Sequence, residues 1–383
     1  MRREALLRVV RDVLAHRITQ VRGSAWGTHL GWATDRELQA AVGVDSIELV
    51  EAATDASALF LLERPGWEDY LLRDRTLEGW AAVAHAALAE TGALRFRSSG
   101  SRGERHEHVH RLASLQAEAL HFASLLRAPG VVRTAVPTHH IYGFIFGVLL
   151  PEALDVATAD YCGRMPTTLL REVVEGDVVV AHPMVWQALA ALDVRWPARV
   201  TGVTSTAPCP PDTIHRLRHA GLSRMIEVYG SSETAGIGWR DEPGASFRLL
   251  PGWRLSADGM QLCAEDGRMA TLPDHVQVDA DRGGVTPVGR LDDAVQVAGH
   301  NVHPARVAER LRGHPGVAAA AVRLDSTRAR LKAYIVPEPG CMPSADELRA
   351  WCMAALPDAA VPARFDFGAA LPRNVMGKDA DWA

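Results

Sequence analysis

The chain has 383 residues, of which 48% are hydrophobic and 23% charged, and its net charge is −5. This length is enough for two or three domains, and the composition is that of an ordinary globular protein. The acidic balance argues against a nucleic-acid partner, and no apolar run is long enough for a transmembrane helix. Five scattered cysteines, never in a CxxC pair, indicate reduced thiols, so we expect a cytoplasmic protein that uses neither membrane nor nucleic acid.

The first 92 residues are predicted to be mostly helical. An amphipathic pattern begins the chain, with apolar residues at the spacing of one helix face, namely Leu6, Val9, Val10, Val13 and Leu14. A second helix is predicted within 43–63, where Asp45 or Ser46 provides an N-cap and Glu48 places negative charge in the first turn. A third helix is predicted over 77–90.

From residue 93 onward short apolar strands alternate with helical patterns, which indicates an α/β core. Residues 291–383 contain two helices and two Val- or Leu-rich strands, which is typical of a small α+β domain. We therefore predict three parts, a helical domain over 1–92, a core over 93–290 and a C-terminal domain over 291–383.

A polar loop joins the first two parts. The segment Phe96–His106 reads FRSSGSRGERH and contains three serines, two glycines and three arginines. Glycine lets the backbone approach a ligand closely, while hydroxyls and backbone N–H groups hold phosphate oxygens. The loop therefore suggests a nucleotide triphosphate, although it is not a Walker loop. The alternative interpretation is a polar linker between two domains.

Seven stretches in order resemble motifs of the adenylate-forming superfamily of acyl- and aryl-acid ligases. SSGSRGERH at 98–106 resembles the phosphate loop, VPTHHIYG at 136–143 the histidine-containing border of the acyl pocket, and STAP at 205–208 the adenine turn. VYGSSET at 228–234 resembles the YGxTE motif, and residues 272–293 resemble the TGD…GRxDD run. Residues 299–317 resemble the start of a mobile C-terminal domain, and LPRNVMGK at 371–378 ends in the late lysine of the family.

The resemblance implies a fold, an adenylate-forming α/β core with a small mobile α+β domain, and a set of nucleotide contacts. The phosphate loop would hold the leaving phosphates of ATP, and the adenine turn and the YGxTE motif would contact the rest of the nucleotide. The residues implied are Ser98, Ser99, Gly100, Ser101, Gly103, Ser205, Ala207, Tyr229 and Gly230.

The same resemblance implies the reacting groups. Ser232 would touch the α-phosphate, and Glu233 would hold Mg²⁺, a hard ion that prefers oxygen ligands. Asp274 would accept the ribose hydroxyls, and Arg290 would contact ribose or phosphate. The remaining assignments are His140 as the pocket histidine, Lys378 as the catalytic lysine and Asp292 as the hinge of the C-terminal domain.

Lys378 stands out for a compositional reason. Of 41 basic residues only Lys332 and Lys378 are lysines, so arginine is the default cation of this chain. A lysine therefore indicates a place where a compact point charge is useful. The alternative is a surface lysine on a frayed tail.

The first 92 residues resemble an acyl carrier protein. The resemblance lies in the order of elements and in GVDSIEL, Gly43–Leu49, at the head of the second helix. It implies a phosphopantetheine arm on Ser46, placed at a helix N-terminus where a phosphodiester is favoured. Such an arm requires a phosphopantetheinyl transferase as a partner. The alternative is that Ser46 only caps a helix.

Several residues depart from the family pattern or extend it. Arg102, Arg105 and His106 replace the usual residues of the phosphate loop. We expect these changes to affect the rate of the reaction rather than its type. The alternating histidines at 106, 108 and 110 are interpreted as entering a helix, where a period of two does not place metal ligands on one face.

The type of acid follows from what surrounds His140. No aspartate accompanies it, which favours an acid without an α-amine, and Trp186 and Tyr142 are candidates for an aromatic pocket. We therefore expect an aryl or unsaturated acyl acid.

Three functions remain open. The first is an enzyme that activates a small carboxylic acid with ATP and Mg²⁺ and passes the acyl group to a phosphopantetheine thiol on Ser46 or on a partner carrier protein. The second is the same enzyme with coenzyme A as acceptor. The third is a non-catalytic docking protein on a degenerate nucleotide-binding scaffold.

Overall fold

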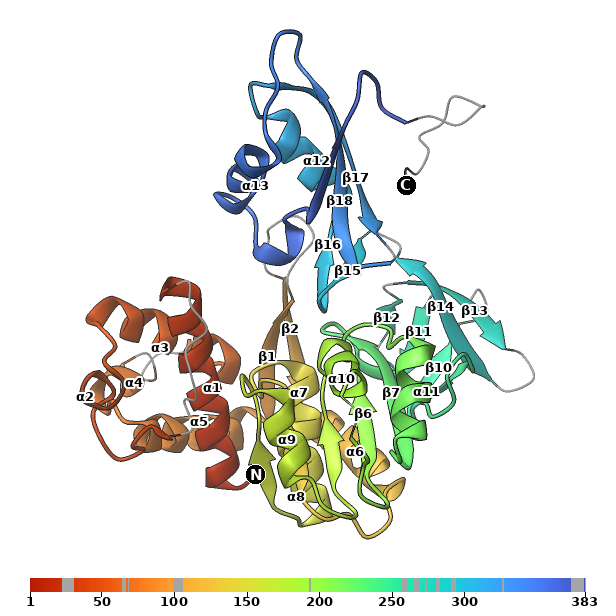
Figure 1. The fold of residues 1–383 in the computed structure, drawn as a ribbon. Helices are drawn as coiled ribbons and strands as arrows, with labels where there is room; N and C mark the ends of the chain where they lie inside the picture. Colours follow the sequence, from red (N-terminus) through yellow and green to blue (C-terminus); the bar gives the residue numbers. More distant parts are fainter. Residues whose placement is uncertain are drawn as a thin grey trace. The chain divides into compact units, whose positions relative to one another are not determined.

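The computed structural model describes residues 1–22, 31–63, 67, 69–98, 106–192, 194–256, 261–264, 267, 269–272, 274–279, 283–290, 294–325, 327–372 and 382, with the backbone alone at 98, 289 and 290. It contains two compact units (Figure 1). The first comprises the described residues of Met1–Ser98, Arg105–Thr271 and Gln277–Thr286, and the second those of Leu272–Val276 and Pro287–Ala383.

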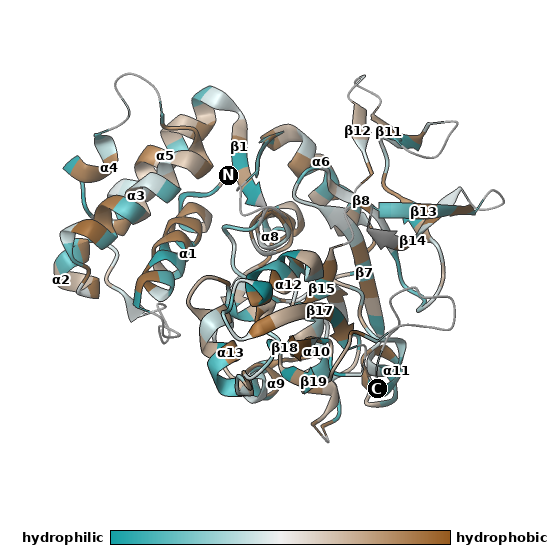
Figure 2. Cartoon of the chain, turned by 90° about the horizontal axis from the view of Figure 1, so that it is seen from above, coloured by the Kyte–Doolittle hydropathy of each residue, from teal (hydrophilic) through white to brown (hydrophobic). Residues whose placement is uncertain are grey.

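The described N-terminal residues are helical, as predicted. The helices are α1 (Arg3–Arg22), α2 (Leu38–Val42), α3 (Ser46–Phe60), α4 (Tyr70–Arg73) and α5 (Leu77–Thr91). A capping box begins α3, because the Asp45 side chain accepts the N–H groups of Ile47 and Glu48 and the Glu48 side chain accepts the Asp45 N–H. Asp45, and not Ser46, is therefore the cap. Both hydrophobic and hydrophilic residues lie along α1 (Figure 2).

The polar side of α1 contacts the α/β core and not only water. Asp12 is 3% exposed, and its Oδ2 accepts hydrogen bonds from the Thr138 N–H at 2.7 Å and the Thr138 hydroxyl at 2.6 Å. Arg8 donates to the Gly147 carbonyl at 2.8 Å, and Arg11 lies 3.6 Å from Asp160. These contacts tie the first helix to the segment that carries His140.

The apolar side of the N-terminal helices belongs to the same hydrophobic core as the following region. Leu14 and Trp80 are fully buried in one cluster with Phe144 and Ile226. The expectation of a separate domain over 1–92 therefore differs from the structure, in which these helices are part of the first unit. The local pattern predicted the helices correctly but did not indicate what they pack against.

A β-hairpin follows α5. Its strands, β1 (Ala93–Ser98) and β2 (His106–Arg111), are antiparallel, with Phe96 opposite His108. The sequence predicted a helix from His110, whereas α6 (Leu112–Ser124) begins only after the hairpin. Pairing with β1 places His106, His108 and His110 in a strand, where a period of two does put them on one face.

The centre of the first unit is a sheet whose last two strands, β13 and β14, include residues of both units. In the described residues it has nine strands in the order β13-β14-β9-β8-β7-β6-β5-β3-β4. The strands from β4 to β7 are parallel and β7, β8 and β9 are antiparallel. They are β3 (Val132–Thr134), β4 (Thr158–Asp160), β5 (Val178–Val180), β6 (Thr201–Thr204), β7 (Arg224–Ser231), β8 (Ala235–Arg240), β9 (Phe247–Leu249), β13 (Asp274–Asp279) and β14 (Gly284–Arg290).

Both faces of the parallel region are buried. On β5, Val178 and Val180 belong to the core that contains α1 and α6, while Val179 belongs to a second core on the other face. The first face also contacts α7 (Ile141–Phe144), a π-helical turn (Ile145–Leu149) and α8 (Leu150–Leu154). The second is covered by α9 (Pro166–Glu172), α10 (Pro183–Ala190) and α11 (Pro211–His219) (Figure 1).

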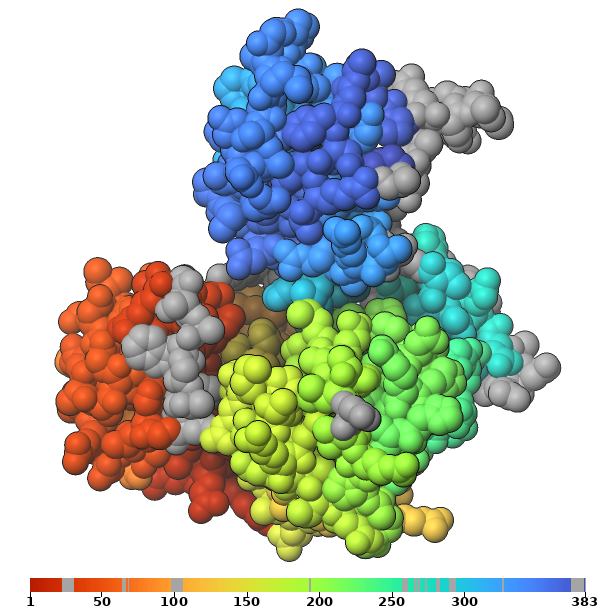
Figure 3. Space-filling view, in the orientation of Figure 1, coloured from red at the N-terminus to blue at the C-terminus, as the bar shows by residue number. Residues whose placement is uncertain are grey.

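A small sheet of β10 (Trp253–Leu255), β11 (Gln261–Ala264) and β12 (Met269–Thr271) completes the first unit. The second unit contains β15 (Val295–Val297), β16 (His300–Val302), α12 (Pro304–Arg312), β17 (Val317–Asp325), β18 (Arg330–Pro337), α13 (Ala345–Met353), a 3₁₀ turn (Asp358–Ala360) and β19 (Arg364–Phe367). These elements share their own core and form a compact body, blue in Figure 3. Lys332 is only 6% exposed and lies under the Trp382 ring, 4.9 Å from its centroid.

Replacing Asp12 by alanine should destabilise the first unit. The change leaves the Thr138 N–H and hydroxyl buried without an acceptor, so we expect the free energy of unfolding to fall by about 3 kcal/mol. Urea unfolding of the full chain measures this. Asp35→Ala, at an exposed position, should change stability by less than about 0.5 kcal/mol, and equal effects of the two changes would show that Asp12 does not anchor α1.

Candidate functional site

The loop between β7 and β8 carries the residues that were predicted to act on the nucleotide. Ser231 pairs with Ala235, so Ser232, Glu233 and Thr234 form the hairpin turn. Gly230 precedes it at a break in register, and a Cβ there would lie 2.2 Å from the Ala235 carbonyl oxygen, so only glycine fits. We refer to residues 229–235 as the catalytic loop, after the roles that the sequence predicts for Ser232 and Glu233.

The catalytic loop lies beside a second predicted turn. Ser205 and Ala207 directly follow β6, the parallel neighbour of β7, and the Ser205 hydroxyl donates to the Val228 carbonyl at 2.9 Å. The structure thus brings the predicted adenine turn and the catalytic loop together at the carboxyl ends of adjacent parallel strands. This is where open α/β sheets bind their ligands.

Two histidines of β2 contact Ser232 and Glu233 of the catalytic loop. The Nε2 of His110 lies 2.8 Å from the Ser232 carbonyl oxygen, and the Nε2 of His108 lies 3.6 Å from Oε1 of Glu233. His110 is buried, whereas the Glu233 side chain is 43% exposed. The sequence analysis missed these contacts. Their signal was the alternation of histidines, which fits a strand rather than a helix.

His140 lies in a group of three imidazoles. Its ring centroid is 4.2 Å from that of His139, and His16 of α1 lies 4.6 Å from His139 and 5.9 Å from His140. His140 immediately precedes α7 and is exposed. Within the described residues no group of three or more histidine, cysteine or acidic side chains has the arrangement of a metal site.

Two residues proposed to line an aromatic pocket lie in the core instead. The Tyr142 hydroxyl and the Trp186 ring N–H both point to the carbonyl oxygens of Ala181 and Val203, at 3.0–3.2 Å. They approach from opposite faces of the sheet, since Tyr142 and Trp186 belong to different hydrophobic clusters. Burial raises the pKa of Tyr142 well above its ordinary value. Neither side chain is available to contact a substrate in this structure.

Other predicted residues are only partly described. Asp274 begins β13 and is half-buried, and Arg290 ends β14 without a described side chain. Ser98 ends β1, again with backbone alone. Six predicted residues lie outside the described part of the chain, namely Ser99, Gly100, Ser101, Gly103, Asp292 and Lys378.

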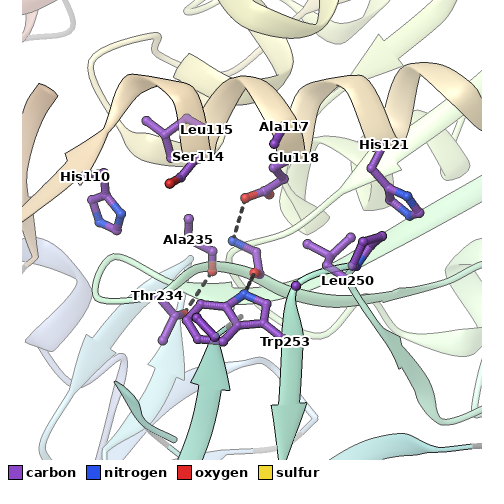
Figure 4. A pocket seen from close by; sticks show the side chains of 14 residues that line it. His110, Ser114, Leu115, Ala117, Glu118, His121, Thr234, Ala235, Leu250 and Trp253 are labelled. Carbon is purple, nitrogen blue, oxygen red and sulfur yellow. Dashed lines mark hydrogen bonds between the residues drawn. The ribbon is translucent and has the colours of Figure 1, made fainter. Parts of the chain in front are cut away.

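A cavity of about 260 Å³ lies between α6 and the inner side of the catalytic loop (Figure 4). It is lined by His110, Ser114, Leu115, Ala117, Glu118, His121, Thr234, Ala235, Gly236, Leu250, Pro251, Gly252, Trp253 and Ala264. Oε2 of Glu118 accepts the Gly236 N–H at 3.0 Å, and burial raises the pKa of this carboxyl to about 7, opposed by that hydrogen bond. Desolvation lowers the pKa of His121.

The comparison with known proteins identifies the family. Residues 306–378 match the model of the AMP-binding enzyme C-terminal domain. The 4-coumarate–CoA ligase of Cereibacter sphaeroides is 38% identical over 350 residues, which cover 89% of this chain and 84% of that protein. The chain belongs to the adenylate-forming ligases. It is an enzyme of the class that activates carboxylic acids with ATP, and the predicted fold class is confirmed.

Two further similarities complete the comparison. The structure of the amide bond synthetase McbA from Marinactinospora thermotolerans has a TM-score of 0.61 at 20% identity and covers 97% of this chain and 92% of that one, which shows a shared fold. The fatty acid–[acyl-carrier-protein] ligase ScoC of Streptomyces coeruleorubidus is 31% identical over 265 residues, covering 64% of this ligase and 50% of that protein.

The extent of the match with the 4-coumarate–CoA ligase shows that the similarity reaches into the N-terminal helices. A match over 89% of the chain must include part of its first 92 residues, so this part of the ligase has a counterpart in the 4-coumarate–CoA ligase. That agrees with the packing of α1 and α5 against the core. Within the described residues no helix is long and apolar enough to cross a membrane.

The raised pKa of Glu118 predicts a pH dependence of stability. Below pH 4.5 the carboxyl is protonated in both states, and between pH 4.5 and about 7 the unfolded chain loses the proton that the folded chain keeps. The free energy of unfolding should therefore fall as pH rises through this window. Glu118→Gln removes this titration, so relative to wild type it should gain up to about 3 kcal/mol between pH 4.5 and 8.

Urea unfolding at several pH values measures this difference. Glu175→Gln makes the same chemical change at an exposed position, 58% accessible in its side chain, and should show no such trend. If wild type and Glu118→Gln keep a constant difference across the window, Glu118 does not titrate near neutral pH.

Proposed function

We propose that this ligase converts a carboxylic acid and ATP to an acyl-adenylate and then transfers the acyl group to the thiol of coenzyme A. In the first step a carboxylate oxygen attacks the α-phosphorus, the bond to the β-phosphate oxygen breaks, and pyrophosphate leaves. In the second step the sulfur attacks the acyl carbon, AMP leaves as the carbon–oxygen bond of the anhydride breaks, and the thiol proton passes to water. Both steps bring together anions, which must be neutralised and oriented.

The observation that supports this proposal most directly is the meeting of two loops at adjacent strand ends. The Ser205 hydroxyl of the turn after β6 donates to the carbonyl of Val228 in β7, directly before the catalytic loop. A nucleotide across these strand ends would meet Ser205 and Ala207 on one side and Tyr229 to Glu233 on the other. Asp274 and Arg290 are proposed as its ribose contacts.

Glu233 and Ser232 are proposed as the groups nearest the α-phosphate. The Glu233 carboxylate is partly exposed and supplies hard oxygen donors, so it fits Mg²⁺, which would neutralise phosphate charge when bound. His108 lies beside this carboxylate and orients it, while His110 fixes the Ser232 carbonyl. The chain thus holds both loop residues from the β2 side without help from the ligand.

Coenzyme A is the proposed acceptor because the 4-coumarate–CoA ligase, by its name, uses that thiol and matches nearly the whole chain. A carrier thiol is the second candidate, favoured by one observation. Ser46 is exposed beside two exposed apolar side chains, Ile47 at 70% and Val50 at 49%. Such a surface suits a docking phosphopantetheinyl transferase. The ScoC similarity, though partial, is compatible with a carrier protein as partner. The non-catalytic alternative is set aside, because the chain is an acid ligase.

The proposed acid is aromatic or unsaturated and has no α-amine. The segment around His140 offers imidazoles and apolar side chains, and the sequence 136–143 contains no aspartate that would suit an ammonium group. Conjugated acids match the 4-coumarate of the relative's name.

Lys378→Ala should abolish most adenylate formation. The lysine is proposed to stabilise the pentavalent α-phosphate and the attacking carboxylate, and loss of one such contact lowers the rate by roughly 10²–10³. Pyrophosphate exchange with a panel of aryl and acyl acids measures it. Arg328→Ala removes an exposed cation of the same unit and should leave exchange unchanged. Equal rates for wild type and Lys378→Ala would remove the lysine from the mechanism.

Ser46→Ala separates the two acceptors. With coenzyme A as acceptor, we expect equal rates of thioester formation for wild type and Ser46→Ala, because Ser46 takes no part. We also expect no gain of mass on wild type co-expressed with a phosphopantetheinyl transferase. A phosphopantetheine mass on wild type that Ser46→Ala lacks, followed by acylation of that arm, would instead establish transfer within the chain.

A further inference from the structure

The cavity between α6 and the catalytic loop contains a carboxyl oxygen that has no partner among the described groups. Glu118 uses Oε2 to accept the Gly236 N–H at 3.0 Å, while its Oε1 is buried and unpaired in the described structure. Nε2 of His121, one turn further along α6, is also buried and lacks a partner among those residues. Figure 4 shows both side chains extending from α6 toward the opposite wall. Buried polar atoms are normally hydrogen-bonded, so these two call for a bound partner.

The missing partner of Glu118 is a cation. Three other buried carboxylates of the first unit each form an ion pair with an arginine. These pairs are Glu48–Arg22 at 2.6 Å, Asp177–Arg133 at 2.5 Å and Glu227–Arg240 at 2.7 Å. By contrast, the described residues that line the cavity include no arginine or lysine. Burial without a compensating cation is what raises the pKa of Glu118 to about 7. A bound cation would therefore compensate a charge that the protein itself leaves unpaired.

The other walls of the cavity suit an organic cation better than a bare ion. The Trp253 ring lines the cavity and is fixed by its N–H, which donates to the Gly236 carbonyl at 3.0 Å. Aromatic rings attract ammonium groups, and Leu115 and Leu250 add apolar surface. Burial lowers the pKa of His121, so its ring is neutral and can present Nε2 as an acceptor. The volume of about 260 Å³ limits the bound molecule to a small one.

We propose that the cavity binds a small organic ammonium ion, a protonated primary amine on an apolar or aromatic group, whose N–H groups donate to Oε1 of Glu118 and Nε2 of His121. The amine is neither the acid nor the thiol of the proposed reaction, so this inference goes beyond the proposed function and does not rest on it. Thr234 and Ala235 of the catalytic loop line the same cavity. A bound amine would therefore contact the loop directly.

Fluorine NMR titration of the full chain at pH 8 tests the proposal without ATP or acid. The probes are 4-fluorobenzylammonium and 4-fluorobenzyl alcohol, which share a ring and a methylene and differ in charge. Wild type should bind the ammonium probe roughly 10- to 100-fold more tightly than the alcohol. Glu118→Gln keeps an oxygen for the Gly236 N–H but removes the charge, so this preference should fall to about threefold or less while alcohol binding stays the same. Glu175→Gln, the exposed control, should keep the wild-type preference.

The pH dependence of binding gives a second readout on the unmodified protein. The ammonium probe needs the ionised carboxyl, so its affinity should rise by about tenfold from pH 6 to pH 8, while alcohol binding stays level. His110 and His121 are the other titratable side chains among the described residues that line the cavity, and their protonation at lower pH would repel the cation in the same direction. The trend that remains in Glu118→Gln measures their share, and it should be the smaller part.

Three results would overturn the proposal. The first is equal binding of the two probes by wild type, or no binding of the ammonium probe up to about 10 mM, the range of weak ligands of this size. The second is a preference that Glu118→Gln keeps. The third is a pH trend of equal size in wild type and Glu118→Gln. Matching thermal midpoints for the three proteins exclude misfolding as the cause of a lost preference.

Discussion

A buried carboxylate on the first helix, that of Asp12, fixes how α1 packs within the first unit. Asp12 is enclosed between α1 and the turn before α7, and its carboxylate accepts hydrogen bonds from the N–H and the hydroxyl of Thr138. A buried charge that loses its partners is strongly unfavourable, so the helix and the turn must stay together. Because of this contact His16 reaches the imidazoles of His139 and His140, and Arg8 reaches the π-helical turn at Gly147. The N-terminal helices are thus a structural part of the ligase core.

The support of the catalytic loop follows a related principle. Its backbone is held at Ser232 by an imidazole of β2 and just beyond it, at Gly236, by a carboxylate of α6. The second support is a buried carboxyl whose pKa burial raises to about 7. A loop held in this way keeps its shape before any nucleotide arrives, as electrostatic stabilisation of a transition state requires.

Sequence reasoning predicted the parts of this protein that depend on local patterns. The apolar spacing of α1 and a helix start at Asp45 or Ser46 could be identified from the order of the residues, and the family resemblance pointed to the loops after β6 and β7. What that order could not reveal is what a polar face contacts. Arg8 and Asp12 have the pattern of a solvated helix face, and only tertiary packing makes them internal. Likewise the histidines of β2 require a partner strand, and Glu118 becomes unusual only when Gly236 packs against it.

The burial of Lys332 has a consequence for chemical labelling. This amine lies under the Trp382 ring and donates to the Trp382 carbonyl, so it is shielded from reagents. The sequence has only one other lysine, Lys378. Active esters that modify primary amines are therefore directed away from Lys332 in the folded protein. Apart from the terminal amine, such a reagent becomes a selective probe of a single side chain. The extent of its reaction in the presence of nucleotide or acid would follow the environment of Lys378 in the unmodified enzyme.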